Sequence, residues 1–187
     1  MRELLITTSR RPTQQIRILC RDLHAVLGRS VYINRGKLSL QKLVDEALAI
    51  GQDRLLLLKR WKGNPGKMEF ITLAPKVQRL FPVVYLHSVV TQRELGRARV
   101  GSSTIESVVV ESENSEVERL ADALSQFLGI EKRRQETVEG RIYMSLEESL
   151  GHLAMITFKK CPEYIEIGPR LVIRHLVWSE REEKAEE

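Results

Sequence analysis

The sequence predicts an α/β fold made of two similar halves, and three observations lead to this prediction. The chain has 187 residues, of which 42% are hydrophobic, which is enough for one compact core. Short aliphatic runs typical of strands alternate with segments in which apolar residues recur at helical spacing. The order of these segments repeats: strand, helix ending at Gly28 or Gly129, connection, strand and hairpin partner. We therefore expect an internal duplication at an offset of about one hundred residues.

The first half opens with a strand at residues 4–8 and a helix that we place with Pro12 in its first turn, where its missing N–H does no harm. Apolar residues recur along one face of this helix until Gly28 ends it. One face of the helix therefore belongs to the core. After the helix we expect a short extended segment at residues 31–34.

A second helix and a hairpin complete the first half. Ser39 is a capping residue, and the helix that follows it ends at Gly51. Residues 55–58 are an uninterrupted aliphatic run, which suits a strand covered on both faces. The turn sequence of residues 63–66 then brings residues 68–73 back as the second arm of a hairpin.

The second half repeats this layout with more polar connections. It begins with a strand at residues 82–90 and a basic loop that carries Arg93, Arg97 and Arg99. A strand at residues 105–110 leads into a helix that Ser115 and Glu118 cap and Gly129 ends. The last elements we expect are a short helix at residues 145–150, a strand at 153–158, an extended pair at 164–178 and a frayed charged tail at 179–187.

Charge divides the chain unevenly between these halves. Residues 1–100 hold 19 Lys and Arg against 7 Asp and Glu, whereas residues 101–187 hold 11 against 18. We therefore expect one domain over residues 1–187, with a basic half at about 1–80, an acidic half at about 81–178 and the tail at 179–187. A basic half of this kind is typical of proteins that bind phosphate backbones. The alternative is a surface that is merely well solvated.

Several classes of protein are excluded by what the sequence lacks. No apolar run approaches the roughly 20 residues that span a bilayer, and residues 1–9 have no signal-peptide pattern, so we expect a cytoplasmic protein without a membrane partner. Cys20 and Cys161 are best read as buried free thiols. There is no phosphate-binding loop, nucleophile elbow, pair of catalytic carboxylates or metal-spaced His and Cys set, so we expect no enzymatic activity, cofactor, metal or small-molecule substrate.

The strongest candidate site is the turn formed by Ser9, Arg10 and Arg11. It lies between a strand and a helix, where free N–H groups and the positive end of the helix favour an anion and two guanidinium groups can grip phosphate oxygens. Arg17 and Arg21 would extend this surface along the helix. The alternative is that these arginines form ordinary surface ion pairs.

A second candidate is the loop formed by Asn34, Arg35, Gly36 and Lys37. It combines an amide, two cations and a residue able to take positive φ, which lets backbone approach a phosphate. A purely structural turn is the alternative.

The third candidate comprises Arg60, Trp61 and Lys62, which follow Lys59 at the mouth of the predicted hairpin. One aromatic ring among cations is the combination expected for single-stranded RNA, with base stacking and phosphate neutralisation. Aromatic residues make up only 5% of the chain, however, so a broad stacking platform is absent. Trp61 can equally be a core residue of the hairpin.

Three segments together resemble the Brix domain of ribosome-biogenesis proteins: residues 6–12, the Asn34-Arg35-Gly36 triplet and residues 166–170. The resemblance covers nearly the whole chain and is closest to the small-subunit processome branch. It implies a duplicated α/β unit similar to the anticodon-binding domain of class II aminoacyl-tRNA synthetases. The absence of long basic or coiled extensions suggests a minimal, archaeal version. In the family the triplet is a hallmark, which favours a functional role for it here.

Arg170 is the last candidate RNA-binding residue. Gly168 and Pro169 interrupt an otherwise regular strand, and Pro there implies an edge or a bend that could carry Arg170 to the same surface. A kink that serves only the fold is the alternative.

These observations favour a ribosome assembly factor that binds rRNA or its precursor without chemistry of its own and acts in rRNA processing and subunit assembly. Charge argues for RNA, whereas only the resemblance argues for ribosome assembly. One alternative is a protein-interaction module that docks ribosomal or assembly proteins, with the acidic half facing basic partners. Another is a tRNA-related anticodon-binding accessory domain.

Overall fold

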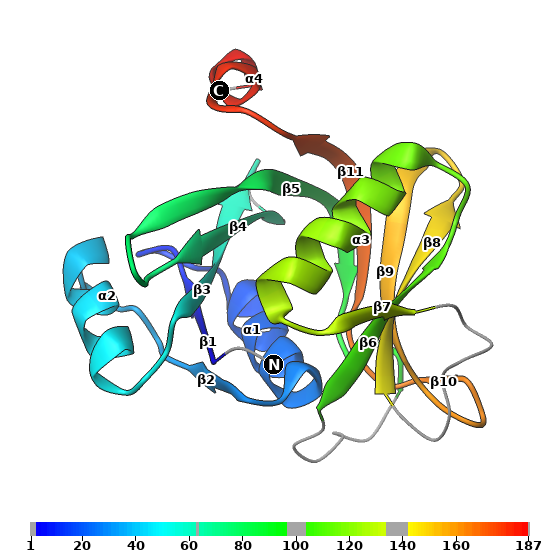
Figure 1. Cartoon of the computed structure of the whole chain (residues 1–187), viewed down its shortest axis with the longest axis horizontal. Coiled ribbons are helices and arrows are strands. Elements are labelled where there is room, and N and C mark those ends of the chain that lie inside the picture. Colours follow the sequence, from blue (N-terminus) through cyan, green and yellow to red (C-terminus); the bar gives the residue numbers. More distant parts are fainter. Residues whose placement is uncertain (1–2, 63, 97–103, 134–141, 187) are drawn as a thin grey trace.

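A computed structural model describes residues 3–62, 64–96, 104–133 and 142–186 as one mixed sheet with helices on its faces (Figure 1). The first-half elements are β1 (Leu4–Thr8), α1 (Gln14–Leu27), β2 (Ser30–Tyr32), α2 (Leu40–Ala49), β3 (Arg54–Trp61), β4 (Asn64–Thr72) and β5 (Gln78–Val90). The strand expected to begin the second half is therefore β5, which pairs with β4 and belongs to the first half. The second-half elements are β6 (Ile105–Glu111), α3 (Ser115–Leu128), β7 (Glu131–Arg133), β8 (Ile142–Ser149), β9 (His152–Lys160), β10 (Ile165–Glu166), β11 (Arg170–Val177) and α4 (Glu180–Glu186).

The two halves have the same strand order when each half is read from its own outer edge of the sheet. The order in the whole sheet is β2-β1-β3-β4-β5-β11-β9-β8-β6-β7, with β10 beside β9. In the first half β1 lies parallel to β2 and β3, and β3 is antiparallel to β4. In the second half β6 lies parallel to β7 and β8, and β8 is antiparallel to β9. The antiparallel pair β5 and β11 joins the two halves at the centre of the sheet.

The main core lies on the face of the sheet that carries both α1 and α3. Leu19 and Leu23 of α1 belong to the same buried cluster as Leu120 of α3. The rings of Phe70 in β4 and Phe127 in α3 meet edge to face, with centroids 5.0 Å apart. Because one residue of this pair comes from each half, the halves share a single core and are stabilised together.

The opposite face of the first half is covered by α2. Leu43 of α2 packs against Leu55 and Leu57 of β3, whereas Leu56 and Leu58 of β3 face the main core. The aliphatic run of β3 is therefore buried on both faces, which confirms the expectation for residues 55–58.

Local signals placed the helices well, with small shifts at their ends. Ser39 caps α2 as expected, since its hydroxyl accepts a hydrogen bond from the N–H of Lys42 at 3.2 Å. The helix α1 begins at Gln14 after the cap Thr13, so the prediction that Pro12 lies inside its first turn was wrong. The cap of α3 is Asn114, whose side chain accepts from the N–H of Glu116 at 2.9 Å, and not Ser115. Each shift is only one or two residues.

The short helix expected at residues 145–150 was wrong, because most of this segment belongs to β8. It pairs with β6 on one side and β9 on the other. Tyr143 faces a small cluster with Val109, whereas Met144 and Leu146 face the main core. Burial on alternate sides of a strand held by two neighbours outweighs the weak helical preference of its glutamates.

The charged tail was also mispredicted, since residues 180–186 form the helix α4. The N–H of Glu182 donates to the hydroxyl of Ser179 at 3.3 Å, and the Glu182 carboxylate accepts from the N–H of Trp178 at 2.7 Å. These bonds satisfy backbone groups at the start of the helix. Arg97, Arg99 and Gly63 lie outside the described residues. Of the helices that the structure describes, none is long and apolar enough to cross a membrane.

Candidate nucleic-acid interface

The three predicted basic segments lie at the ends of three neighbouring parallel strands. Residues 9–12 follow β1, residues 34–37 follow β2, and residues 59–62 close β3. Because β1 lies parallel to both β2 and β3, their carboxyl ends lie at the same edge of the sheet. In open α/β sheets this edge is the usual place for a binding site.

Residues from the ends of β1 and β3 line an open hollow of about 650 Å³. The lining residues are Ser9, Arg10, Arg11, Lys59, Arg60 and Lys62. The N–H of Ser9 donates to the carbonyl of Leu58 at 2.8 Å, which fixes the turn after β1 against β3. The hollow is thus lined by five cations and no carboxylate, a composition suited to a polyanion.

The cations of this surface are largely free of acidic partners. Arg10, Arg11 and Arg60 are exposed, and no described carboxylate lies within ion-pair distance of any of them. Lys59 is the exception, since its Nζ lies 2.8 Å from Oε1 of Glu69. The prediction that these arginines are available to an external anion therefore fits the geometry better than the ion-pair alternative.

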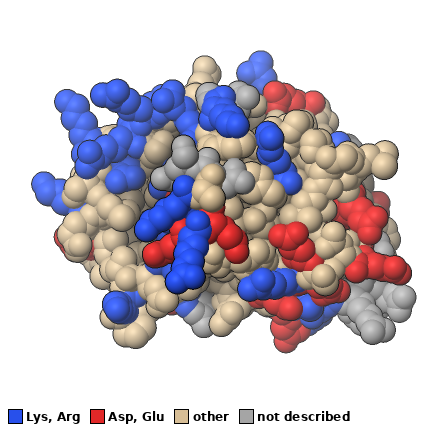
Figure 2. All heavy atoms as spheres, turned by 90° about the horizontal axis from the view of Figure 1, so that it is seen from above, with Lys and Arg blue, Asp and Glu red and all other residues tan. Residues whose placement is uncertain are grey.

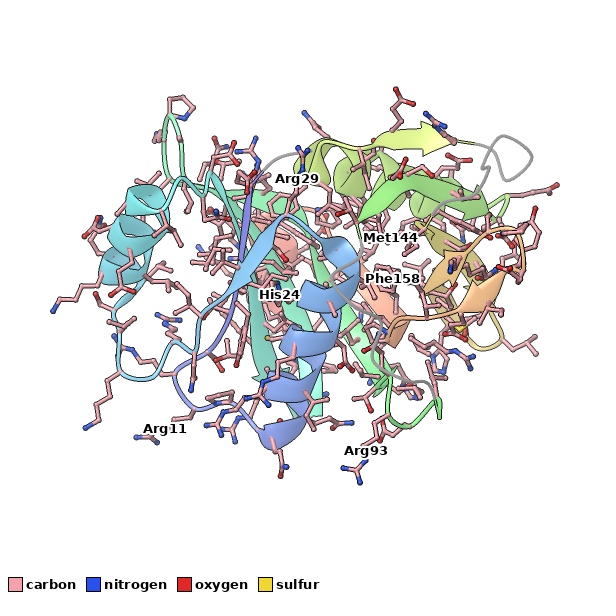
Figure 3. All side chains as sticks on the ribbon, turned by 90° about the horizontal axis from the view of Figure 1, so that it is seen from below. Arg11, His24, Arg29, Arg93, Met144 and Phe158 are labelled. Atoms are coloured by element: carbon pink, nitrogen blue, oxygen red, sulfur yellow. The ribbon has the colours of Figure 1, made fainter. Side chains whose placement is uncertain are left out.

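The first turns of α1 extend the basic surface. Arg17 and Arg21 are exposed on α1, and both lie close enough to Tyr32 of β2 to lower the pKa of its hydroxyl, although burial outweighs them and raises that pKa. Figure 3 shows Arg11 and Arg93 near the end of α1 where the helix begins, with Arg29 toward its other end. A phosphate near the start of α1 would also face the positive end of the helix.

The loop after β2 splits into exposed and buried residues. Asn34 and Lys37 are exposed, and Gly36 has φ of 53° with open space around it. Arg35, in contrast, is buried, and its Nε donates to the carbonyl of Leu38 at 3.2 Å. Burial and the nearby charge of Arg10 lower the pKa of Arg35. Arg35 therefore closes its own turn, and Lys37 is the cation that this loop presents.

Trp61 is packed into the sheet and is not an open stacking platform. Its ring meets Tyr85 edge to face at 5.2 Å and lies in the same manner 6.1 Å from His175. Two cations cover it, with Lys62 Nζ 4.5 Å and the Arg174 guanidinium 5.2 Å from the ring centroid. The geometry supports the alternative for Trp61, a hairpin core residue that holds cations in place.

Arg170 is engaged elsewhere. Its Nη2 lies 2.6 Å and its Nε 3.1 Å from the two carboxylate oxygens of Glu166, which is a bidentate ion pair. Gly168 is buried against Phe158, so close that an added Cβ would lie 2.6 Å from the ring. The Gly168–Pro169 interruption therefore serves the fold, and Arg170 lies in β11 beside β5 and not in the hollow.

Sequence reasoning did not include Lys59 among the site residues, although it lines the hollow. It also missed Lys67 of β4 and Arg79 of β5, which line a second hollow together with Lys59. Lys67 is paired with Lys59 in the register of β3 and β4. The spacing of these lysines about the turn was the available signal, but a bulge after Lys59 obscured it.

Figure 2 shows one face of the molecule, on which Lys and Arg gather over one side, whereas Asp and Glu lie near the middle and over the other side. No group of three or more His, Cys, Asp or Glu suited to a metal ion occurs within the described parts of the chain. The exposed charged side chains of this edge are cations that follow or close β1 and β3 or lie on α1.

Comparison with known proteins identifies the family. No protein-family model matches the chain. A protein of Methanopyrus kandleri described as a "Probable Brix domain-containing ribosomal biogenesis protein" is 34% identical to it, with 93% of this chain and 94% of the relative covered. The chain belongs to the Brix domain-containing ribosomal biogenesis proteins. Relatives with the same description in Pyrococcus horikoshii and Pyrococcus furiosus are each 46% identical over 93 residues, or 50% of this chain and 42% of the relative. The matched segment thus spans less than half of these Pyrococcus relatives.

Solved structures share the fold of this Brix-domain protein. The crystal structure of a probable ribosomal biogenesis protein from Aeropyrum pernix K1 superposes with a TM-score of 0.78 at 23% identity, over 96% of this chain and 98% of that one. Mil, an archaeal Imp4-like protein, gives 0.65 at 20% identity, over 94% and 99%. The mixed α/β architecture predicted from the sequence is therefore confirmed.

Proposed function

We propose that this Brix-domain protein acts in ribosome assembly by binding rRNA or its precursor, without enzymatic activity, through the basic edge at the carboxyl ends of β1, β2 and β3. The observation that carries the proposal is the hollow lined by Arg10, Arg11, Lys59, Arg60 and Lys62, most of which have no described acidic partner. Backbone phosphates are the chemistry that such a surface recognises, and base identity would contribute little because its one aromatic ring is packed.

A filter-binding titration with archaeal rRNA precursor fragments tests the proposal. The double variant Arg10→Glu/Arg11→Glu should weaken binding at least tenfold, because it replaces two attractive contacts with two repulsive ones. The matched control is Arg133→Glu/Lys160→Glu, which changes net charge equally in the second half. Among the described residues, Arg133 forms an ion pair with the exposed Glu131, and Lys160 is exposed, so this control should fold and bind nearly as the unmodified protein. Equal losses in both variants would refute the proposed site.

Two alternative functions would give different results in binding experiments. Partners retained in a pull-down after nuclease treatment would favour a protein-interaction module, for which the acidic residues of the second half are the motivating feature. Tighter binding to tRNA than to rRNA fragments would favour the anticodon-binding alternative.

A further inference from the structure

A second group of cations lies beside the basic hollow on the sheet face that α2 and α4 occupy. Lys59 of β3, Lys67 of β4 and Arg79 of β5 surround the buried carboxylate of Glu69. Lys59 Nζ lies 2.8 Å, Lys67 Nζ 3.4 Å and Arg79 Nη2 3.4 Å from Oε1 of Glu69. Lys59 also lines the basic hollow, so the two groups of cations are contiguous.

A carboxylate from α4 occupies this group. Oε1 of Glu183 lies 2.5 Å from Nζ of Lys67 and also forms an ion pair with Nη2 of Arg79. Glu183 is 7% exposed, and it is the only buried residue among those of α4 whose side chains are described. The group therefore binds an anion that the chain itself supplies.

Charge balance shows why this anion can be exchanged. Lys59, Lys67 and Arg79 face the carboxylates of Glu69 and Glu183, while Glu180 and Lys184, both of α4, also line the site with opposite charges. Glu69 is fixed within β4, whereas Glu183 belongs to a seven-residue helix. Without Glu183, these three cations would exceed the Glu69 carboxylate by two charges. Hydrogen bonds from Arg79 and Lys67 hold the pKa of Glu183 below its usual range despite its burial, so the occupant is an ionised carboxylate at neutral pH.

The attachment of α4 allows it to leave without disturbing the sheet. Trp178 lies just before α4 and is fixed to α3, because its Nε1 donates to Glu116 at 3.3 Å and the Arg119 guanidinium lies 3.7 Å from its ring centroid. Release of Glu183 would therefore move only the chain that follows Trp178.

We propose that Lys59, Lys67 and Arg79 form a second phosphate-binding subsite, which the Glu183 carboxylate occupies until a backbone phosphate of the bound RNA displaces it. This inference rests on the proposed RNA-binding function. An RNA strand held in the hollow would reach the subsite over Lys59, and α4 would act as an internal competitor that restricts binding to strands able to fill both places.

Fluorescence anisotropy with a labelled single-stranded RNA of mixed sequence tests the subsite. Glu183→Gln should bind about 3- to 10-fold more tightly than the unmodified protein at low salt, because the internal competitor is weakened. Its salt slope should be steeper by about 0.7, the value for one additional phosphate on a single strand. The charge-matched control is Glu163→Gln, which removes an exposed carboxylate that makes no described ion pair and should change affinity little.

A double-mutant cycle separates the subsite from a general charge effect. In a Lys67→Met/Arg79→Met background, Glu183→Gln should no longer increase affinity, since the cations that it frees are absent. Thermal unfolding of every variant checks that each one folds, and we expect Glu183→Gln to fold because Lys67 keeps Glu69 as a partner.

The outcomes distinguish the two proposals. If the unmodified protein binds RNA and loses it in Arg10→Glu/Arg11→Glu, but Glu183→Gln changes nothing or gains equally in the Lys67→Met/Arg79→Met background, the subsite is refuted and the proposed function stands. If no variant binds RNA, the proposed function is refuted and the subsite with it.

Discussion

The salt dependence of RNA binding can be predicted from the number of exposed cations at the basic edge and on the first turns of α1. Seven of them are exposed and have no described acidic partner: Arg10, Arg11, Arg17, Arg21, Lys37, Arg60 and Lys62. Each contact with a single-stranded phosphate contributes about −0.7 to the slope of log K against log salt. Contacts from the four in the hollow alone would give a slope of about −3, and contacts from all seven would give about −5. We expect a measured slope between these limits.

Neutralising chosen cations then tests which of them touch RNA. Arg10→Gln/Arg11→Gln should make the slope shallower by about 1.4, because two contacts are lost. Arg35→Gln provides the control within the same edge, since Arg35 is buried and its Nε donates to the carbonyl of Leu38. It should lower the free energy of unfolding by about 1 kcal/mol and leave the slope unchanged. Filter binding between about 50 and 200 mM KCl gives both slopes. An Arg35→Gln slope as shallow as that of the double variant would refute the assignment.

Three further predictions concern the structure that supports the site. Gly168→Ala should lower the free energy of unfolding by about 1–2 kcal/mol in urea titrations, because its Cβ would meet the Phe158 ring and this clash outweighs the entropic gain of alanine; an unchanged midpoint would contradict the close contact. Burial raises the pKa of the Cys20 thiol to about 12, and Cys161 is also buried. Neither thiol should react with a thiol reagent at pH 8 until the protein unfolds, and rapid labelling of the folded protein would contradict this. Burial opposes ionisation of Glu183, but hydrogen bonds from Arg79 and Lys67 outweigh burial and depress the pKa of this carboxyl group. The docking energy of α4 is therefore fully present above the unfolded pKa of about 4.3 and is lost as the pH falls from there through the depressed folded pKa. Amide NMR resonances of α4 should show this release, and a helix that stays docked in acid would contradict it.

Elements with strong local signals were predictable from the sequence, and those decided by pairing were not. Gly28 and Gly129 end α1 and α3 where expected, since both have positive φ and follow regular apolar patterns. Residues 145–150 were misread because glutamates in a short segment resemble a helix, and only pairing with β6 and β9 makes the segment a strand. The likeness to the anticodon-binding domain of class II aminoacyl-tRNA synthetases stays a prediction, although the repeated strand order is consistent with a duplicated unit.

The basic segments of the site were visible in the sequence, whereas the role of each side chain was not. The clusters of cations are visible in the sequence, but the sequence of a loop does not predict that the Arg35 side chain is buried while that of Lys37 is exposed. The ion pair of Arg170 had a signal, because Glu166 lies four residues before it. The docking of Glu183 on Lys67 joins residues 116 positions apart, and no local pattern indicates it.

Crosslinking of bound rRNA precursor to the protein, followed by mass spectrometry of the modified peptides, would locate the RNA on the surface of the protein. Charge-reversal variants report on affinity, whereas crosslinks report on position. RNA bound at the basic edge should give crosslinked peptides that cover residues 9–12, 34–37 and 59–62, where β1, β2 and β3 end. Crosslinks concentrated in the acidic second half, with none at these three segments, would contradict binding at this edge.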